Sequence, residues 1–343
     1  MQAAASFGEV RSSQAFLGPL PSSAPAAPVA RSTCGEERGT SARRRTGQCP
    51  LAVDAHRYPR RVTRIALLGG GRMGEALIAG LLDGGSEPDA LAVAEADPER
   101  RRALEERFPG VRIAPTAAWI VNDAEVVVVA VKPADVPALL EGALPTLPAD
   151  TLVLSIAAGV TIGELEQAVP GRPVVRAMPN TPALVRKGAA AIAGGSHSTD
   201  VHLAMAEALL AAVGTVVRVP ESMLDAVTGL SGSGPAYVFL LAEALVEGGV
   251  LNGLPRDVAT ALVHQTILGA GTLLAEGDET AEVLRAAVTS PGGTTAAGLR
   301  ALESRSVRAA ILEAVTAATE RSRELGASSG SGASGSDVPG GSG

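Results

Sequence analysis

Three glycines stand at the spacing of a dinucleotide-binding turn. Gly69, Gly71 and Gly74 form a G-x-G-x-x-G pattern between an apolar stretch, Ile65–Leu68, and an amphipathic one, Glu75–Leu82. In such a turn the first glycine allows a sharp change of direction, the second admits a pyrophosphate, and the third lets the helix pack close to the strand. The N–H groups at the helix start then face the phosphates. The pattern predicts a strand–turn–helix unit that binds a dinucleotide; the alternative is a glycine-rich turn without a ligand.

A second stretch suited to chemistry is Ser290–Thr295, with the sequence Ser-Pro-Gly-Gly-Thr-Thr. The successive N–H groups of Gly293, Thr294 and Thr295 stand where a helix begins and are suited to hold one carboxylate. Ser290 adds a hydroxyl group. From the pattern alone, however, an N-capped helix after a Pro-Gly turn is the preferred interpretation.

Small and polar residues follow three other predicted strands. Lys132 comes at the end of the apolar run Val126–Val131, and Ile156–Gly159 follows the next strand. Because ligands of doubly wound sheets bind at the carboxyl ends of strands, Lys132 is placed to contact a cofactor, and the small residues leave room for a nicotinamide ring. The alternatives are a lysine that only reaches solvent and small residues that only reflect an alanine-rich chain. Asn180, between two prolines, either lines the site, where it would fix the cofactor or a neighbouring loop, or satisfies its own backbone.

The composition excludes several classes of protein. The chain has 343 residues, of which 46% are hydrophobic, enough for two domains with cores. A net charge of −7 and 2% aromatic residues argue against nucleic acid as a partner. No uninterrupted apolar run reaches the roughly 18 to 20 residues of a membrane span, so no membrane is expected either. Both cysteines, Cys34 and Cys49, precede the glycine turn, and we expect a cytoplasmic location. The histidines do not cluster, and no metal site is predicted.

The predicted elements divide the chain into four parts. Residues 1–60 lack apolar periodicity and form a predicted disordered, low-complexity extension, either a transit segment or an over-extended start. Residues 61–219 alternate strands with helices, which predicts an α/β fold with a Rossmann-type, doubly wound, mainly parallel sheet. Residues 220–326 form a predicted all-α domain, and residues 327–343 a disordered Gly/Ser tail.

The element predictions follow from periodicity and from start and stop signals. The predicted strands are 65–68, 91–95, 111–114, 126–131, 152–157, 173–176, 189–193 and 215–219, and the predicted helices are 75–82, 98–107, 135–144, 162–168, 200–212, 235–247, 256–275, 280–288, 295–303 and 306–325.

The helix predicted at Pro235–Glu247 is nearly all apolar, which indicates a helix buried all round. A domain of this size cannot cover such a helix by itself, so we expect at least a homodimer. Ser231 and Ser233 lie in the turn before the helix, and either is placed to cap it.

Five motifs occur in the order found in the Δ1-pyrroline-5-carboxylate reductase family, and together they resemble it over about residues 64–325. The motifs are Gly69–Gly74, Ala130–Pro133, Met178–Thr181, Ser231–Tyr237 and Thr289–Thr295. The resemblance implies reduction of Δ1-pyrroline-5-carboxylate to L-proline, the last step of proline biosynthesis, by hydride transfer from NAD(P)H. It also implies a site formed where two helical domains meet, in a homodimer or a larger homo-oligomer of dimers.

The resemblance assigns roles to residues of these motifs. Thr295 is the catalytic residue, whose hydroxyl hydrogen-bonds the ring nitrogen of the substrate. The substrate-binding residues are Ser290, Gly293, Thr294 and Ser233, and the cofactor-binding residues are Gly69, Gly70, Gly71, Arg72, Met73, Gly74, Glu95, Ala130, Val131, Lys132, Pro133, Ala157, Ala158, Gly159 and Asn180. Two positions depart from the family: Thr294, where alanine is usual, and Arg72, where many relatives carry asparagine.

The choice of cofactor rests on two opposed signals. Glu95 closes the second predicted strand about 20 residues after Gly74, where an acid binds the ribose hydroxyls and favours NAD(H). Arg100–Arg102 follows closely and either holds a 2′-phosphate or forms a solvated helix face. We favour NADP(H), as the resemblance to bacterial members of the family implies, with NAD(H) as the alternative.

Two other functions compete with this one. A β-hydroxyacid-dehydrogenase-like oxidoreductase joins a similar glycine turn to a helical domain, but needs a lysine on the first long helix of that domain, and Pro235–Glu247 contains none. The second is a non-catalytic dinucleotide-binding paralogue. In such a protein Ser290, Gly293 and Thr295 would be free to change, yet all three match the family motif.

Overall fold

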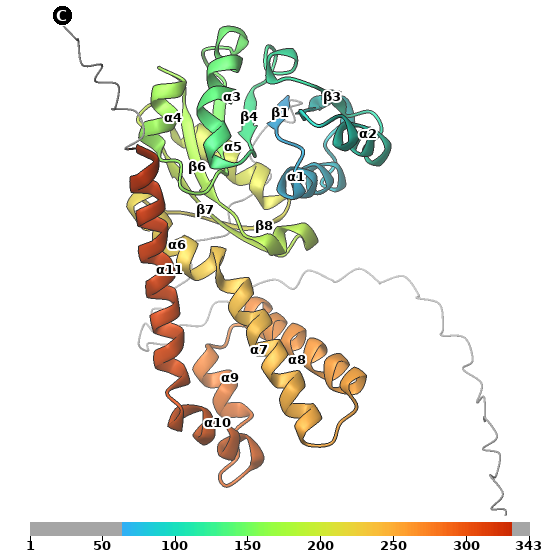
Figure 1. Ribbon diagram of the computed structural model, residues 1–343, viewed down its shortest axis with the longest axis vertical. Coiled ribbons are helices and arrows are strands. Elements are labelled where there is room, and N and C mark those ends of the chain that lie inside the picture. Colours follow the sequence, from blue (N-terminus) through green and yellow to red (C-terminus); the bar gives the residue numbers. More distant parts are fainter. Residues whose placement is uncertain (1–63, 331–343) are drawn as a thin grey trace, which may run out of the picture. The chain divides into compact units, whose positions relative to one another are not determined.

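Residues 64–330 are described by a computed structural model, and within them eight strands form one sheet (Figure 1). The predicted extension, residues 1–60, and residues 331–343 of the predicted tail lie outside the described residues. The strands are β1 (Ile65–Leu68), β2 (Leu91–Ala94), β3 (Arg112–Ala114), β4 (Val126–Val129), β5 (Leu152–Ser155), β6 (Val174–Met178), β7 (Gly188–Gly194) and β8 (Gly214–Arg218).

The strand order β3-β2-β1-β4-β5-β6-β7-β8 is that of a doubly wound sheet. Strands β1 to β6 run parallel, and β7 pairs antiparallel with β6 and parallel with β8. The mainly parallel sheet is therefore confirmed, and the antiparallel pair is a feature that periodicity did not predict. Residues 179–187, which join β6 to β7, are fewer than the dozen or so that a parallel crossover needs.

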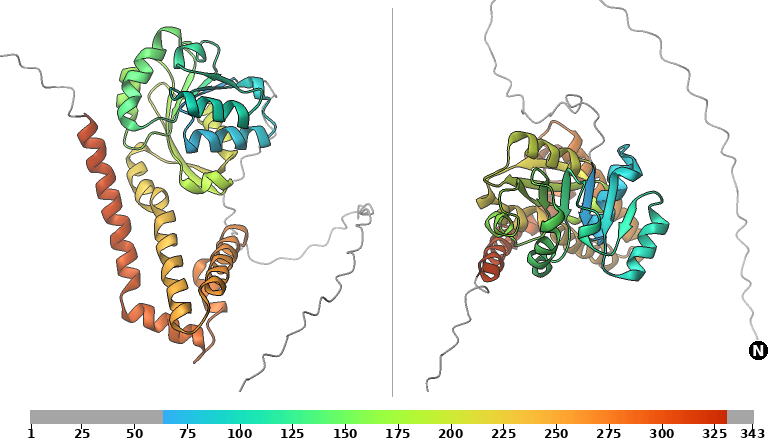
Figure 2. Two further views of the ribbon diagram at one scale, coloured as in Figure 1. Left: turned by 45° about the vertical axis from the view of Figure 1, so that its right-hand side comes forward. Right: turned by 90° about the horizontal axis from the view of Figure 1, so that it is seen from above.

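Helices cover both faces of this sheet (Figure 2). On one face α1 (Arg72–Asp83), α2 (Pro98–Arg107) and α5 (Asp200–Ala211) contribute to one apolar cluster. On the other face α3 (Val136–Ala143) and α4 (Ile162–Ala168) contribute to a second. Every residue of β1, β2, β4 and β5 is buried, as expected for parallel strands covered on both sides.

The rest of the described chain is helical, as predicted. Its elements are α6 (Leu224–Val227), the π-helical turn η7 (Thr228–Gly232), α7 (Gly234–Leu251), α8 (Arg256–Glu276), α9 (Ala281–Ala287), α10 (Thr294–Ser304) and α11 (Val307–Gly330). The short α6 and η7 were not predicted. Helix α11 continues past its predicted end at Leu325 to Gly330, because extending an existing helix costs far less than starting one.

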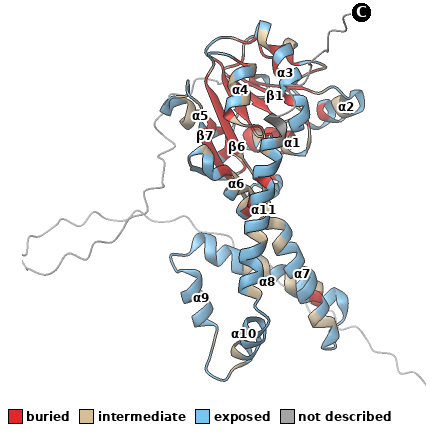
Figure 3. Cartoon of the chain, turned by 60° about the vertical axis from the view of Figure 1, so that its left-hand side comes forward, coloured by how far each residue is buried: buried red, intermediate tan, exposed pale blue. Residues whose placement is uncertain are grey.

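Helix α7 is not covered within one chain, as expected for a helix that needs a second copy to bury it, and its burial by a partner stays a prediction. It packs along α8, but Val246 is its one buried residue. Figure 3 shows the contrast: the central strands are red, whereas α7 to α11 are mostly pale blue. The apolar side chains of this region, which we call the uncovered helical surface, include Phe239, Leu240, Leu241, Leu262, Leu268, Ile311 and Leu312.

Two helical stretches, Glu221–Leu251 and Arg256–Glu276, are long and apolar enough by length and composition to cross a bilayer. The sequence argument missed them because it required an uninterrupted apolar run, and Glu243 and Glu247 interrupt the first stretch. One or two helices of this kind are weak evidence of a membrane protein.

Polar contacts tie the helical region to the sheet. Arg176 on β6 is buried and pairs with Glu221, with 3.0 Å between Nη1 and Oε1. The same Glu221 oxygen accepts the N–H group of Ile162 at the start of α4, at 2.7 Å. Further along, Ser322 of α11 donates its hydroxyl to Asp225 of α6, at 2.7 Å. The segment that leaves the sheet is thus fixed to it by an ion pair between a buried arginine and a half-buried glutamate.

Candidate functional site

Each of the three glycines of the G-x-G-x-x-G pattern is a glycine for a different structural reason. Gly69 has a φ of 110°, and a Cβ atom there would lie 2.7 Å from the carbonyl oxygen of Ala130. A Cβ atom on Gly74 would collide with the carbonyl oxygen of Gly69. A Cβ atom on Gly71 would meet no atom within 4 Å. Gly69 and Gly74 are therefore needed by the fold, whereas the open space over Gly71 is where a pyrophosphate is expected to approach.

The position of Gly70 also requires a glycine, although the G-x-G-x-x-G motif specifies none there. A side chain there would collide with Leu104 of α2. Its N–H group donates to Glu95 Oε2 at 3.1 Å. The predicted ribose ligand Glu95 is therefore engaged with the glycine turn itself.

Helix α1 starts directly after this turn, with Arg72 and Met73 as its first two residues. The N-cap residue, Gly71, has no side chain that could cap α1. The N–H groups at the positive end of the helix dipole are therefore left for a ligand. The side chain of Arg72 is exposed. It lies at a helix end that disfavours a cation unless an anion is close.

Two further loops meet the glycine turn at the same edge of the sheet. β1 and β4 are neighbours, and the strand order reverses between them, which is where such sheets bind their ligands. The loop after β4 begins with an N–H bond from Ala130 to the Leu68 carbonyl, at 2.8 Å. The loop after β5 begins with a bond from Ile156 to the Val129 carbonyl, at 3.0 Å. The predicted cofactor residues that these loops carry are Ala130, Val131, Lys132, Pro133, Ala157, Ala158 and Gly159.

Lys132 and Gly159 occupy these loops differently. Lys132 is exposed and precedes a 3-10 turn, Pro133–Asp135. Gly159 has a φ of 82°, and a Cβ atom there would meet no atom within 4 Å. The loop after β5 therefore offers open space, as the prediction of a nicotinamide site requires.

Asn180 connects the sheet to the helical region. Its Oδ1 accepts the N–H group of Ala189 at 2.8 Å, and its Nδ2 donates to the carbonyl oxygen of Ser231 at 3.1 Å. It thus holds the neighbouring loop, one of the two site-lining roles considered for it. A contact with the cofactor stays a prediction.

Ser233 is the N-cap residue of helix α7, but neither its hydroxyl nor that of Ser231 makes a capping hydrogen bond. The helix start has no side-chain cap, and Ser231 lies instead in the π-helical turn η7. The Ser233 N–H group donates to the Thr228 carbonyl at 2.8 Å, the bond that closes this wider turn. Such turns are rare in proteins, and many of those that occur lie at functional sites. The half-buried Ser233 remains a predicted substrate-binding residue.

The Ser290–Thr295 turn differs from the prediction in one bond. The N–H group of Gly293 donates to the carbonyl oxygen of Ser290 at 3.0 Å and closes the turn, so it is not available to a carboxylate. No residue in the described part of the chain accepts the N–H groups of the next three residues, Thr294, Thr295 and Ala296, and no side chain caps α10. The available set of donors therefore begins one residue later than predicted.

One chain does not bring this turn to the edge of the sheet. Helix α10 ends beside the start of α11, whereas Gly326, near the other end of α11, approaches the Gly159 carbonyl oxygen. At 1.5 Å per residue, the stretch from Val307 to Gly326 spans about 28 Å. Figure 1 shows α9 and α10 at the end of α11 that lies away from the strands. The two halves of the predicted site are thus separate within one chain.

Family models match both parts of the chain. Residues 221–325 match the family model described as pyrroline-5-carboxylate reductase dimerisation. Residues 64–159 match the model described as NADP oxidoreductase, coenzyme F420-dependent.

Individual relatives give the same result. The chain is 47% identical over 288 residues to a pyrroline-5-carboxylate reductase of Mycobacterium tuberculosis, covering 77% of this chain and 97% of that protein. A solved pyrroline-5-carboxylate reductase of Coxiella burnetii is 35% identical, with a TM-score of 0.74, and the match covers 77% of this chain and 99% of that one. The Plasmodium falciparum enzyme with NADP bound is 30% identical, with a TM-score of 0.68, over 77% of this chain and 98% of that one.

Proposed function

The chain belongs to the pyrroline-5-carboxylate reductase family, and we propose that it reduces Δ1-pyrroline-5-carboxylate to L-proline with a hydride from NADPH. Membership confirms the resemblance predicted from the five motifs. The observation that carries the assignment to a carboxylate substrate is the start of α10. There the N–H groups of Thr294, Thr295 and Ala296 have no acceptor among the described residues.

The cofactor fits the edge of the sheet that carries the glycine turn. The space over Gly71 accepts a pyrophosphate and is the space that a Cβ atom would fill. Lys132 and Gly159, on the two neighbouring loops, are proposed to line the nicotinamide end. When bound, the nicotinamide supplies the hydride, so the protein needs no strong acid or base of its own.

The protein's own part in the reaction is to bind and orient the imine. The N–H groups at the start of α10 hold the substrate carboxylate, where the helix dipole favours a negative charge. Thr295, on the first turn of the same helix, is proposed to donate its hydroxyl to the ring nitrogen as electron density arrives there. Fixing the carboxylate and the nitrogen together orients the imine carbon for hydride transfer.

A second copy of the chain completes the site in this proposal. The separation of the α10 turn from the sheet edge within one chain supports it, and so does the uncovered helical surface. The match of residues 221–325 to a dimerisation model supports a homodimer, or a larger assembly of dimers. The same surface accounts for the apolar α7 and α8 without a membrane. We also propose a cytoplasmic location and no nucleic-acid partner, in keeping with the net charge of −7.

The direct test is an assay of the purified protein with Δ1-pyrroline-5-carboxylate. Oxidation of NADPH, followed by its absorbance, should require the imine and should yield proline. NADH, tested separately, should support a slower reaction. No oxidation of either cofactor by a protein that binds NADPH would favour the non-catalytic paralogue.

A further inference from the structure

The peptide groups of Gly70 are held from both sides by charged side chains. Its N–H group donates to Glu95 Oε2 at 3.1 Å, and its carbonyl oxygen accepts from Arg100 Nη2 at 2.5 Å. Glu95 directly follows β2, and Arg100 belongs to the first turn of α2. Two residues 25 and 30 positions further along the chain thus fix the backbone directly before Gly71.

Both carboxylate oxygens of Glu95 are engaged in these contacts. While Oε2 faces Gly70, Oε1 accepts the N–H group of Asp97 at 3.0 Å. Arg100 Nε lies 3.6 Å from Oε2, and the Glu95 side chain is only 14% exposed. Each oxygen of Glu95 already accepts one backbone N–H group, which leaves fewer of its lone pairs for the two ribose hydroxyls, and its negative charge is opposed by a guanidinium group.

Arg100 is itself fixed by a second acid. Its Nη2 atom lies 3.2 Å from Glu75 Oε1 on α1, and the other oxygen of Glu75 accepts from Arg107. The two helices that flank the glycine turn are therefore joined through Glu75. Because Arg100 bonds to Glu75 and to Gly70 at once, its guanidinium group has a single orientation in this network.

The network acts on the residue that the cofactor is expected to approach. Gly70 cannot move toward α2, because Leu104 fills the space that a side chain at Gly70 would need. Gly71 follows directly, with open space over it. Holding the Gly70 peptide groups therefore fixes the position at which the Gly71 backbone meets a pyrophosphate, before any ligand arrives.

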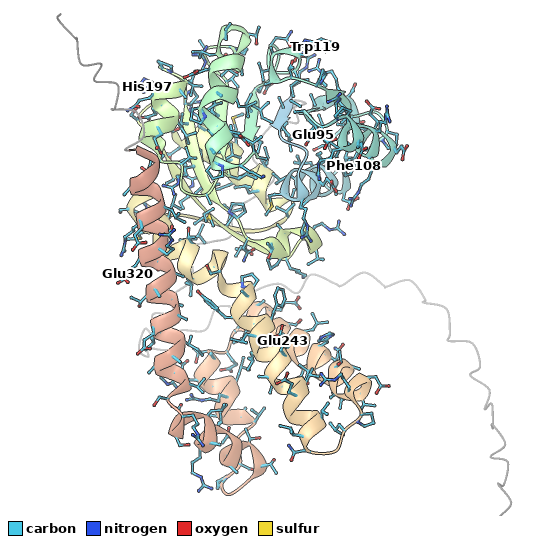
Figure 4. All side chains as sticks on the ribbon, viewed as in Figure 1. Glu95, Phe108, Trp119, His197, Glu243 and Glu320 are labelled. Atoms are coloured by element: carbon cyan, nitrogen blue, oxygen red, sulfur yellow. The ribbon has the colours of Figure 1, made fainter. Side chains whose placement is uncertain are left out.

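We propose that Glu95 and Arg100 are positioning residues that clamp the peptide groups of Gly70 and so preorganise the pyrophosphate turn, and that Glu95 does not select between NADH and NADPH. The inference rests on the proposed cofactor site. It removes the conflict between an acid at the end of β2, labelled in Figure 4, and the use of NADP. Cofactor preference is then decided by groups other than the Glu95 carboxylate.

Two substitutions at Glu95 separate the roles. In Glu95→Gln the amide oxygen still accepts the Gly70 N–H group, but the charge is gone, and the amide NH2 group replaces the oxygen that accepts from Asp97. In Glu95→Ala both the charge and the hydrogen bond from the Gly70 N–H group are lost. Affinities for NADPH and for NADH are measured by fluorescence titration, and thermal unfolding is followed in parallel. Glu106→Gln is the matched control, since Glu106 is an exposed acid on α2, the helix that carries Arg100.

We expect Glu95→Ala to weaken both cofactors by roughly 5- to 50-fold, the scale of one charge-assisted hydrogen bond. Glu95→Gln should recover most of this loss, with the ratio of the NADH and NADPH affinities within about 2-fold of wild type, since the hydrogen bond is retained. A ribose-selecting acid would behave otherwise: Glu95→Gln would weaken NADH and strengthen NADPH. A shift of that ratio by about 10-fold, or 1.4 kcal/mol, would overturn the proposal.

Arg100→Ala tests the other side of the clamp. If both residues act through the Gly70 peptide groups, Glu95→Ala with Arg100→Ala should lose clearly less affinity than the product of the two single losses. Independent, multiplicative losses would contradict a shared role. If the wild-type protein binds neither cofactor, the proposed function has failed; if it binds NADPH and Glu95→Gln alters the ratio, only this inference has failed.

Discussion

The sheet and the helical region bury their apolar residues in different ways. In the sheet, strands such as Leu152–Ser155 are covered on both faces by helices of the same chain. In the helical region Phe239, Leu240 and Leu312 are each more than 60% exposed in one chain. A core that closes within the chain is stable without a partner, whereas an exposed apolar surface of this extent marks an interface. The sheet region therefore covers its core by itself, whereas the helical region is expected to be covered by a second copy of the chain.

Chemistry is divided in the same way. The open space over Gly71 belongs to the sheet, and the free N–H groups at Thr294 and Thr295 belong to the helical region. Each half of the proposed site is built by one region. Four substitution experiments test whether each region carries its own half of the site and whether a second copy brings the halves together.

A charge on the uncovered helical surface should have the largest effect. Leu241 is 52% exposed in one chain, but we expect a partner to bury it. Leu241→Asp should then leave an unpaired charge in the interface and weaken assembly and activity by more than about 100-fold. Sedimentation and the NADPH assay measure both. Val201→Asp is the control, because Val201 is 55% exposed on α5 of the sheet region and should tolerate the charge. If the Leu241→Asp protein were assembled and active, Leu241 would not lie in an interface that the activity needs.

Blocking the pyrophosphate space should act on the sheet region alone. Gly71→Val should weaken NADPH binding by at least about 100-fold, since the side chain fills the open space over the Gly71 backbone, while the fold survives. Gly142→Val is the control: Gly142, on α3, also has no atom within 4 Å of its Cβ position. Titration with NADPH and the melting temperature distinguish a blocked site from a damaged fold. An unchanged affinity of the Gly71→Val protein for NADPH would show that the glycine turn does not bind the cofactor.

Removing the Thr295 hydroxyl should act on the helical half. Its hydrogen bond matters most in the transition state, so Thr295→Ala should lower kcat and kcat/KM by roughly 10- to 1000-fold with little change in NADPH affinity. Thr295→Ser keeps the hydroxyl and should recover much of the rate. Thr294→Ala should be mild, because its expected contact is through the backbone. If Thr294→Ala were the damaging variant, the assignment would be off by one residue.

Mixed assemblies should reveal whether the two halves come from different chains. A dimer of one Gly71→Val chain and one Thr295→Ala chain has one site with both defects and one intact site, if each site is shared. Random pairing of equal amounts should then restore on the order of a quarter of wild-type activity. Sites built within single chains would give no such recovery. The separately purified variants, assayed alone, provide the baseline.

Local patterns in the sequence were sufficient for most elements. Pro98–Arg107 and Ile162–Ala168 begin and end where predicted, because a capping residue, Asp97 or Thr161, precedes each of them. The glycine spacing likewise identified the turn, since the positive φ of Gly69 and the close approach of Gly74 to the Gly69 carbonyl oxygen arise within a few residues. The composition of α7 also indicated that its own domain cannot cover it, and one chain leaves it mostly exposed. Its burial by a partner stays a prediction, because that depends on a second copy.

The sequence by itself determined the alternation of strands and helices, the position of the glycine turn and the family. These follow from hydrogen bonds and apolar periods that repeat over a few residues. Only the tertiary structure decided that Glu95 holds Gly70, that Asn180 holds Ser231, and that Gly293 closes its own turn. The first two join residues 25 and 51 positions apart, and the third depends on the geometry of one turn. Residue type and spacing carry no information on which donor meets which acceptor until the sheet and the helices have packed.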